Sequence, residues 1–296
     1  MRLNEIVSGQ RKMEISRLSL DEELSTEVQS QLIGVGLLDP PTDGVFGPQS
    51  HWALSAFLKL VDRSDATTLD SEVATRLVGA GPDSLLPLRP SSDLAGRVVR
   101  AMQNRGDWIS RHPECVNVVY VEGMNPDGTA NDNAPSVFND LRLAFSISTG
   151  GAPVVLGSWE GTTEPSLFWT EHPMNPAGAA RIQFGQYKAW SVGLHHPGLK
   201  GQHEALVQVR PVTVCRDLNK DFQRTNDRTD TGVFGINQHW GYDRPRDDLG
   251  KSCAGCLVGR TEDGHREFMR IAKSDPRFLI SNSYIFVTAV LPASVV

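Results

Sequence analysis

Apolar residues in the first third of the chain recur at the spacing of an α-helix. Leu24, Val28 and Leu32 follow one another at four-residue intervals, and the pattern ends before Pro40-Pro41. A second apolar stripe follows the next proline, and a third begins near residue 70. The pattern therefore predicts three short amphipathic helices between residues 20 and 80.

Apolar and β-branched runs replace the helical pattern from residue 114 onward. The runs are separated by loops rich in Gly, Pro, Asn and Asp, and they cover residues 116–121, 141–147, 205–209, 211–215 and 284–288. One late helix is expected over residues 262–273. The chain is therefore predicted to be α+β, with a small three-helix domain at residues 20–80, a linker and helix at 81–113, and a mostly β domain with marginal helices at 114–296.

Composition and charge argue against nucleic acid as a partner and against a membrane-spanning segment. The 296 residues carry 29 basic and 35 acidic side chains, a formal net charge of −6, which argues against nucleic acid as a partner because such binding relies on neutralising phosphates. No apolar run is long enough to span a membrane. The first residues show no apolar stretch typical of a secretory signal, so we expect a cytoplasmic location unless lysis or a non-Sec route releases the protein. No cofactor is expected, and the four cysteines are expected to be reduced.

A turn motif follows the first predicted helix. Asp43-Gly44 is a turn dipeptide, Phe46 is expected to fill the small core, and the following proline suits the start of a helix. Together with its flanking apolar positions, this segment resembles the peptidoglycan-binding-like domain of cell-wall enzymes; the flanking positions are Val28, Leu32, Gly36, Ala53 and Phe57. The resemblance implies a three-helix module and peptidoglycan as the partner. The alternative interpretation is a helical interaction or dimerisation domain.

The segment from residue 232 to 260 holds the densest chemistry. A strand would present His239 at its end, and a glycine-rich loop would present Cys256. An imidazole close to a thiol can generate the thiolate that acts as a nucleophile. The backbone N–H groups of Gly255 and Cys256 could bind an oxyanion.

This segment resembles the catalytic motif of L,D-transpeptidases of the YkuD-like family, in which a His-Gly precedes a Ser-x-Gly-Cys-x-Arg. Here His239 precedes Cys256 by 17 positions, and Cys253 stands where the family has serine. The resemblance implies that Cys256 is the nucleophile and His239 its base in acyl transfer on the stem peptides of peptidoglycan. Val258 stands where the family has an arginine, and Arg260 is the candidate replacement.

Further residues are candidates for substrate contact. Trp240 follows His239 directly, and His196 belongs to a histidine-rich loop that could line a cleft or lie on the surface. With Arg260 and Cys253 they complete the predicted substrate-binding set.

Three alternatives use the same segment. Cys253, Cys256 and His239 could bind zinc with His265 as a fourth ligand. The Cys-x-x-Cys pair could be redox-active, or the cysteines could pack as small apolar groups. The sequence therefore leaves open an acyl-transfer enzyme, a non-catalytic peptidoglycan-binding protein whose Cys/His loop is structural, and a Cys/His zinc site.

Overall fold

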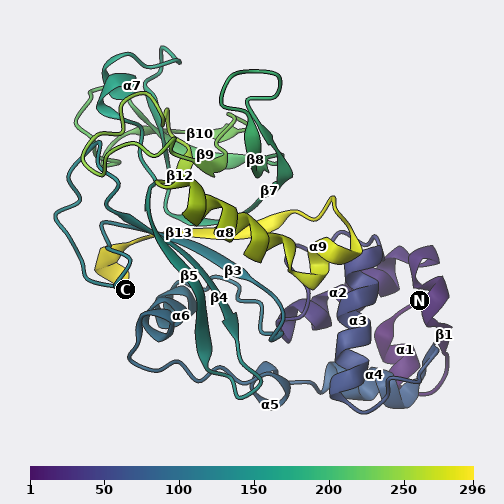
Figure 1. The fold of residues 1–296 in the computed structure, drawn as a ribbon. Helices are drawn as coiled ribbons and strands as arrows, with labels where there is room; N and C mark the ends of the chain where they lie inside the picture. Colours follow the sequence, from purple (N-terminus) through teal and green to yellow (C-terminus); the bar gives the residue numbers. More distant parts are fainter.

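The computed structural model describes residues 1–296 as a helical region beside a larger, mostly β region (Figure 1). The predicted α+β class and the mostly β character of the C-terminal part are confirmed. No helix has the length and apolar character needed to cross a membrane.

The helical region contains more elements than the predicted three helices. Those three correspond to α2 (Glu22–Gly34), α3 (Pro48–Leu60) and α4 (Ser71–Val78). Before and between them lie α1 (Leu3–Val7), the 3-10 helix η1 (Ile15–Leu20), and the paired strands β1 (Met13–Glu14) and β2 (Thr68–Leu69).

One apolar core holds the helical region together. Leu3, Ile6 and Leu18 are buried in the same cluster as Leu24 and Phe57, so the core reaches back before residue 20. Asp side chains cap α2 and α4 by accepting hydrogen bonds from backbone N–H groups of their first turns.

Eight strands of the β region close into a barrel in the order β11-β12-β5-β4-β3-β13-β7-β8. The β3–β13 and β11–β12 pairs are parallel, and the others are antiparallel. The strands are β3 (Asn117–Glu122), β4 (Asp140–Ile147), β5 (Pro153–Thr162), β7 (Gly185–His195), β8 (His203–Gln208), β11 (Gln238–Trp240), β12 (Leu257–Gly259) and β13 (Phe286–Pro292).

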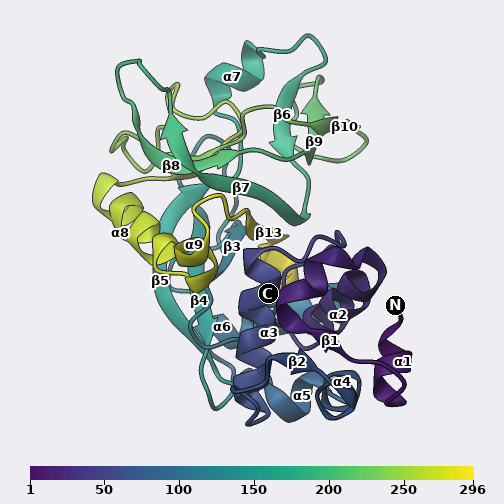
Figure 2. The ribbon, with the colours of Figure 1, turned by 90° about the vertical axis from the view of Figure 1, so that its right-hand side faces the viewer.

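A second sheet and several helices cover the barrel. The sheet has the order β10 (Arg228–Gly232), β9 (Val212–Asp217), β6 (Ala179–Ile182). Helix α6 (Leu94–Arg105) shares an apolar cluster with β3 and β4. Helix α8 (Glu262–Lys273) contacts β5, β8, β11 and β12, and Figure 2 shows it beside β5 and β8. The remaining helices are α5 (Pro82–Leu85), α7 (Leu167–Glu171), α9 (Pro276–Ile280) and η2 (Ala293–Val295).

A buried ionic network joins the helical region to the barrel. Arg277 of α9, only 3% exposed, donates to Asp39 Oδ1 and to Asp275 Oδ2, each at 2.6 Å. The hydroxyl of Tyr284 donates to Asp39 Oδ2 at 2.6 Å. Because Asp39 follows α2 in the sequence, this network fixes the helical region against the C-terminal end of the chain.

Candidate functional site

Strands β11 and β12 bring the two predicted catalytic residues to neighbouring positions. The parallel register pairs His239 with Val258, and Cys256 directly precedes β12. The N–H of Leu257 donates to the carbonyl of Asn237 at 3.0 Å, which extends the pairing beyond β11. His239 and Cys256 therefore lie on adjacent segments, two register positions apart.

The Cys256 thiol is protonated at neutral pH. Its side chain is half-buried, and Sγ donates to the carbonyl of Gly235 at 3.5 Å. Burial raises the pKa of Cys256 to about 11. Sγ shares no hydrogen bond with His239 in this arrangement, so the two residues do not form an ion pair here.

His239 is a buried, neutral imidazole. Its Nδ1 lies 2.7 Å from the carbonyl oxygen of Trp240, which assigns the ring proton to Nδ1 and leaves a lone pair on Nε2. Burial lowers the pKa of His239 well below its ordinary value, and the neighbouring His195 lowers it further. The ring stacks on that of His195 with 3.9 Å between centroids. His239 can thus accept a proton at Nε2.

Two more histidines surround this stack. His203 donates from Nδ1 to a backbone carbonyl at 2.8 Å and accepts at Nε2 from the N–H of Trp240 at 3.0 Å. His265 donates from Nε2 to a backbone carbonyl at 2.8 Å and accepts at Nδ1 from Arg142 at 3.2 Å. Both rings are therefore held as neutral tautomers.

The side chains do not converge on a metal position. No group of three or more His, Cys, Asp or Glu residues is arranged to hold a metal ion. The stacked rings of His195 and His239 are 9° from parallel, so their in-plane lone pairs cannot meet at one ion. The zinc alternative, with Cys253, Cys256 and His239 as ligands, gains no support from this geometry.

Cys253 is sealed inside the loop that presents Cys256. It is fully buried, and Sγ donates to the carbonyl of Glu164 at 2.8 Å. Burial raises the pKa of Cys253 well above its ordinary value, although hydrogen bonds from the backbone N–H groups of Gly255 and Cys256 oppose that shift. These are the N–H groups expected to bind an oxyanion, and here they face a sulfur instead.

Gly255 has a structural reason to be glycine. Its φ is +120°, and a Cβ atom there would lie 2.1 Å from the carbonyl oxygen of Ala180 in β6. The loop therefore packs directly on the second sheet.

The predicted substrate-binding residues lie in different surroundings. Trp240 lines a cavity of about 590 Å³ beside α8, together with His203, and its buried indole N–H has no partner. His196 is exposed and stacks on His195 at 3.9 Å, with a φ of +51°. Arg260 is held by an ion pair with Glu160. Trp240 and His196 thus lie against the rings of His203 and His195, respectively, whereas Arg260 is occupied by its ion pair with Glu160.

The side chain of Glu164 belongs to a buried carboxylate cluster behind the cysteine loop. Thr163 Oγ1 lies 2.7 Å from Glu122 Oε2 and 2.9 Å from Asp140 Oδ2, and a single hydroxyl proton cannot serve both oxygens. Arg224 holds Glu122 through two hydrogen bonds of 2.6 Å, so Glu122 is ionised. Burial and the charges of Glu122 and Glu164 raise the pKa of Asp140 well above its usual range. We therefore assign the extra proton to Asp140.

Comparisons with known proteins add little to this site. No protein-family model matches the chain, and no curated protein matches it. A solved structure from Clostridium acetobutylicum, described as a fused Zn-dependent amidase/peptidase/peptidoglycan-binding domain-containing protein, aligns with a TM-score of 0.29 and 12% identity, over 94% of this chain and 96% of that chain. An alignment at this TM-score carries no conclusion for this chain, so the two motif resemblances stand on their residues alone.

Proposed function

We propose that this chain is a peptidoglycan-directed cysteine acyl-transfer enzyme that acts on stem peptides through Cys256 and His239. The observation that supports the proposal is the parallel register of β11 and β12, which sets a half-buried thiol two positions from an imidazole with an available Nε2. The resemblance of residues 28–57 to peptidoglycan-binding-like domains indicates that the bound polymer is peptidoglycan.

The protonation states define the reaction. Because both groups are neutral at rest, His239 Nε2 takes the Sγ proton as the sulfur attacks the peptide carbonyl carbon. This step requires the Cys256 side chain to rotate away from Gly235. The tetrahedral intermediate then collapses, and the imidazolium returns the proton to the departing amine. Water or an acceptor amine releases the acyl group from sulfur and restores the thiol.

Digestion of purified muropeptides tests the proposal. Cys256→Ala is expected to abolish turnover because it removes the nucleophile. Cys253→Ser is the matched control, since a hydroxyl can keep the hydrogen bond to the Glu164 carbonyl. Full turnover by Cys256→Ala would contradict the assignment of Cys256.

A non-catalytic peptidoglycan-binding protein is the second candidate. The raised pKa of Cys256 and the lack of a hydrogen bond between its Sγ and His239 favour this alternative. It predicts that the wild-type chain sediments with sacculi but releases no product from any muropeptide.

A further inference from the structure

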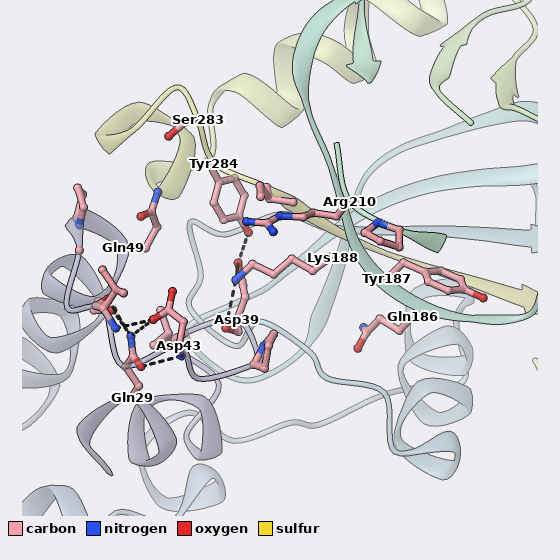
Figure 3. Close-up of a pocket in the computed structure, with 18 residues that line it drawn as sticks. Gln29, Asp39, Asp43, Gln49, Gln186, Tyr187, Lys188, Arg210, Ser283 and Tyr284 are labelled. Carbon is pink, nitrogen blue, oxygen red and sulfur yellow. Dashed lines mark hydrogen bonds and ion pairs between the residues drawn. The ribbon is translucent and has the colours of Figure 1, made fainter. Parts of the chain in front are cut away.

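A groove runs along the junction between the helical region and the barrel. It encloses about 740 Å³, and one wall is the segment that leads into α3 while the other consists of β7 and the approach to β13 (Figure 3). We call it the junction groove; the residues that matter below are Asp39, Asp43, Gln49, Lys188, Arg210 and Tyr284. Residues of both regions line it.

The carboxylates of the junction groove are already engaged. Asp43 Oδ1 accepts from Gln29 Nε2 at 2.7 Å and from the N–H of Val45 at 2.9 Å. Asp39 accepts from Arg277 and from Tyr284 in the buried network described above. Neither carboxylate needs a ligand to complete its hydrogen bonds.

The cations of the junction groove are not engaged in the same way. The exposed Arg210 guanidinium forms no hydrogen bond or ion pair. Lys188 Nζ lies 4.0 Å from Asp39 Oδ2 and 3.4 Å from its carbonyl oxygen, which are long contacts for a charged donor. Figure 3 shows both side chains extending from the barrel toward Asp39 and Tyr284. The barrel wall therefore offers two positive charges without a strong partner.

The opposite wall offers a peptide-like group. The amide of Gln49, in the first turn of α3, lines the groove without a hydrogen-bond partner in the protein. A free amide suits the backbone of an extended peptide, and two cations without a strong partner suit a carboxylate. Because the Gln49 amide and the two cations line opposite walls of one groove, they favour a ligand that carries both a peptide backbone and a carboxylate.

We propose that the junction groove binds the carboxylate-bearing stem peptides of peptidoglycan as a second contact, separate from the reacting site. Lys188 precedes His195 by seven positions along β7, or about 23 Å at the rise of a strand. The groove therefore lies far from the His195–His239 stack. This inference rests on the proposed function for the identity of the polymer, but not for the activity of Cys256.

Sedimentation with purified sacculi, stripped of teichoic acid, tests the groove. All proteins carry Cys256→Ala, so that turnover cannot alter the polymer during the assay. Lys188→Gln with Arg210→Gln is expected to weaken binding by about tenfold, because two charge-assisted contacts are lost. The matched control, Lys12→Gln with Arg228→Gln, removes two exposed charges elsewhere and is expected to bind as well as the Cys256→Ala parent.

The chemistry of the ligand is tested on the polymer side. The parent protein is expected to bind sacculi whose peptide carboxyl groups have been converted to amides about tenfold more weakly than unmodified sacculi, the same loss as expected for the groove variant. Equal binding by the groove variant and the parent would overturn the proposal, as would unchanged binding to amidated sacculi. If the proposed enzymatic activity is wrong, the wild-type chain will show no turnover of muropeptides, while Lys188→Gln with Arg210→Gln will still weaken binding to sacculi.

Discussion

The state of the Cys256 thiol gives the sharpest prediction. Burial raises its pKa from the ordinary 9.0 to about 11, so the thiolate fraction at pH 7.5 is about 100-fold smaller than that of an unperturbed thiol. Iodoacetamide reacts with thiolate, and the other three cysteines are buried. Intact-mass measurements should therefore show one slow adduct, formed about 100-fold more slowly than on a model thiol.

The pH dependence of that labelling separates two mechanisms. We expect the rate to rise about tenfold per pH unit from pH 7 to 9, because the thiolate fraction does so while the pH stays below the pKa. Cys256→Ser should remove the adduct, and His239→Gln should leave the resting rate unchanged. Fast labelling at pH 7 with no further rise would indicate a preformed thiolate–imidazolium pair and would refute the protonation states assigned here.

Three further perturbations test other parts of the structure. The folded-state pKa of Asp140 is well above 3.8, so its contribution to stability is complete below pH 3.8 and is lost as the pH rises toward the folded value. Asp140→Asn should therefore flatten the decline in unfolding free energy that urea titrations measure between pH 4 and 8. An unchanged profile would contradict the proton assigned to Asp140. Gly255→Ala should destabilise the protein by at least about 2 kcal/mol, because a Cβ collides with the Ala180 carbonyl at positive φ; thermal unfolding measures the loss, and a shift below 1 °C would disprove the close approach. Arg277→Met should cost about 3–5 kcal/mol in chemical unfolding, because it leaves two buried carboxylates without their cation, and near-neutral stability would show that the network does not join the two regions.

Local patterns predicted the long elements of this fold but not the short ones. The stripes of α2, α3 and α4 are visible because each helix buries one face over at least two turns. Helix α1 has five residues, too few to show a stripe, yet Leu3 and Ile6 are fully part of the core. The pairing of β11 with β12 depends on barrel closure, which no local pattern encodes.

The candidate site shows the same division. The spacing of His239 and Cys256 indicated that both belong to one site, and the strand register places them on adjacent segments. The raised pKa of the Cys256 thiol could not be predicted, since it arises from burial of the side chain against an apolar cluster that includes Cys253 and Val258. His195 is part of a run that could equally lie on the surface; it is buried because the β7–β8 hairpin turns it onto His239.

The stacked imidazoles have a consequence for acidic surroundings. The pKa values of His195 and His265 are lowered to about 3, and that of His239 is also well below 6.5, because burial disfavours their cationic forms. A solvent-exposed histidine gains its charge between pH 7.5 and pH 5, whereas these rings stay uncharged across that interval. Mild acidification therefore leaves these three rings uncharged, and the lone pair on His239 stays available for a proton from a reacting thiol.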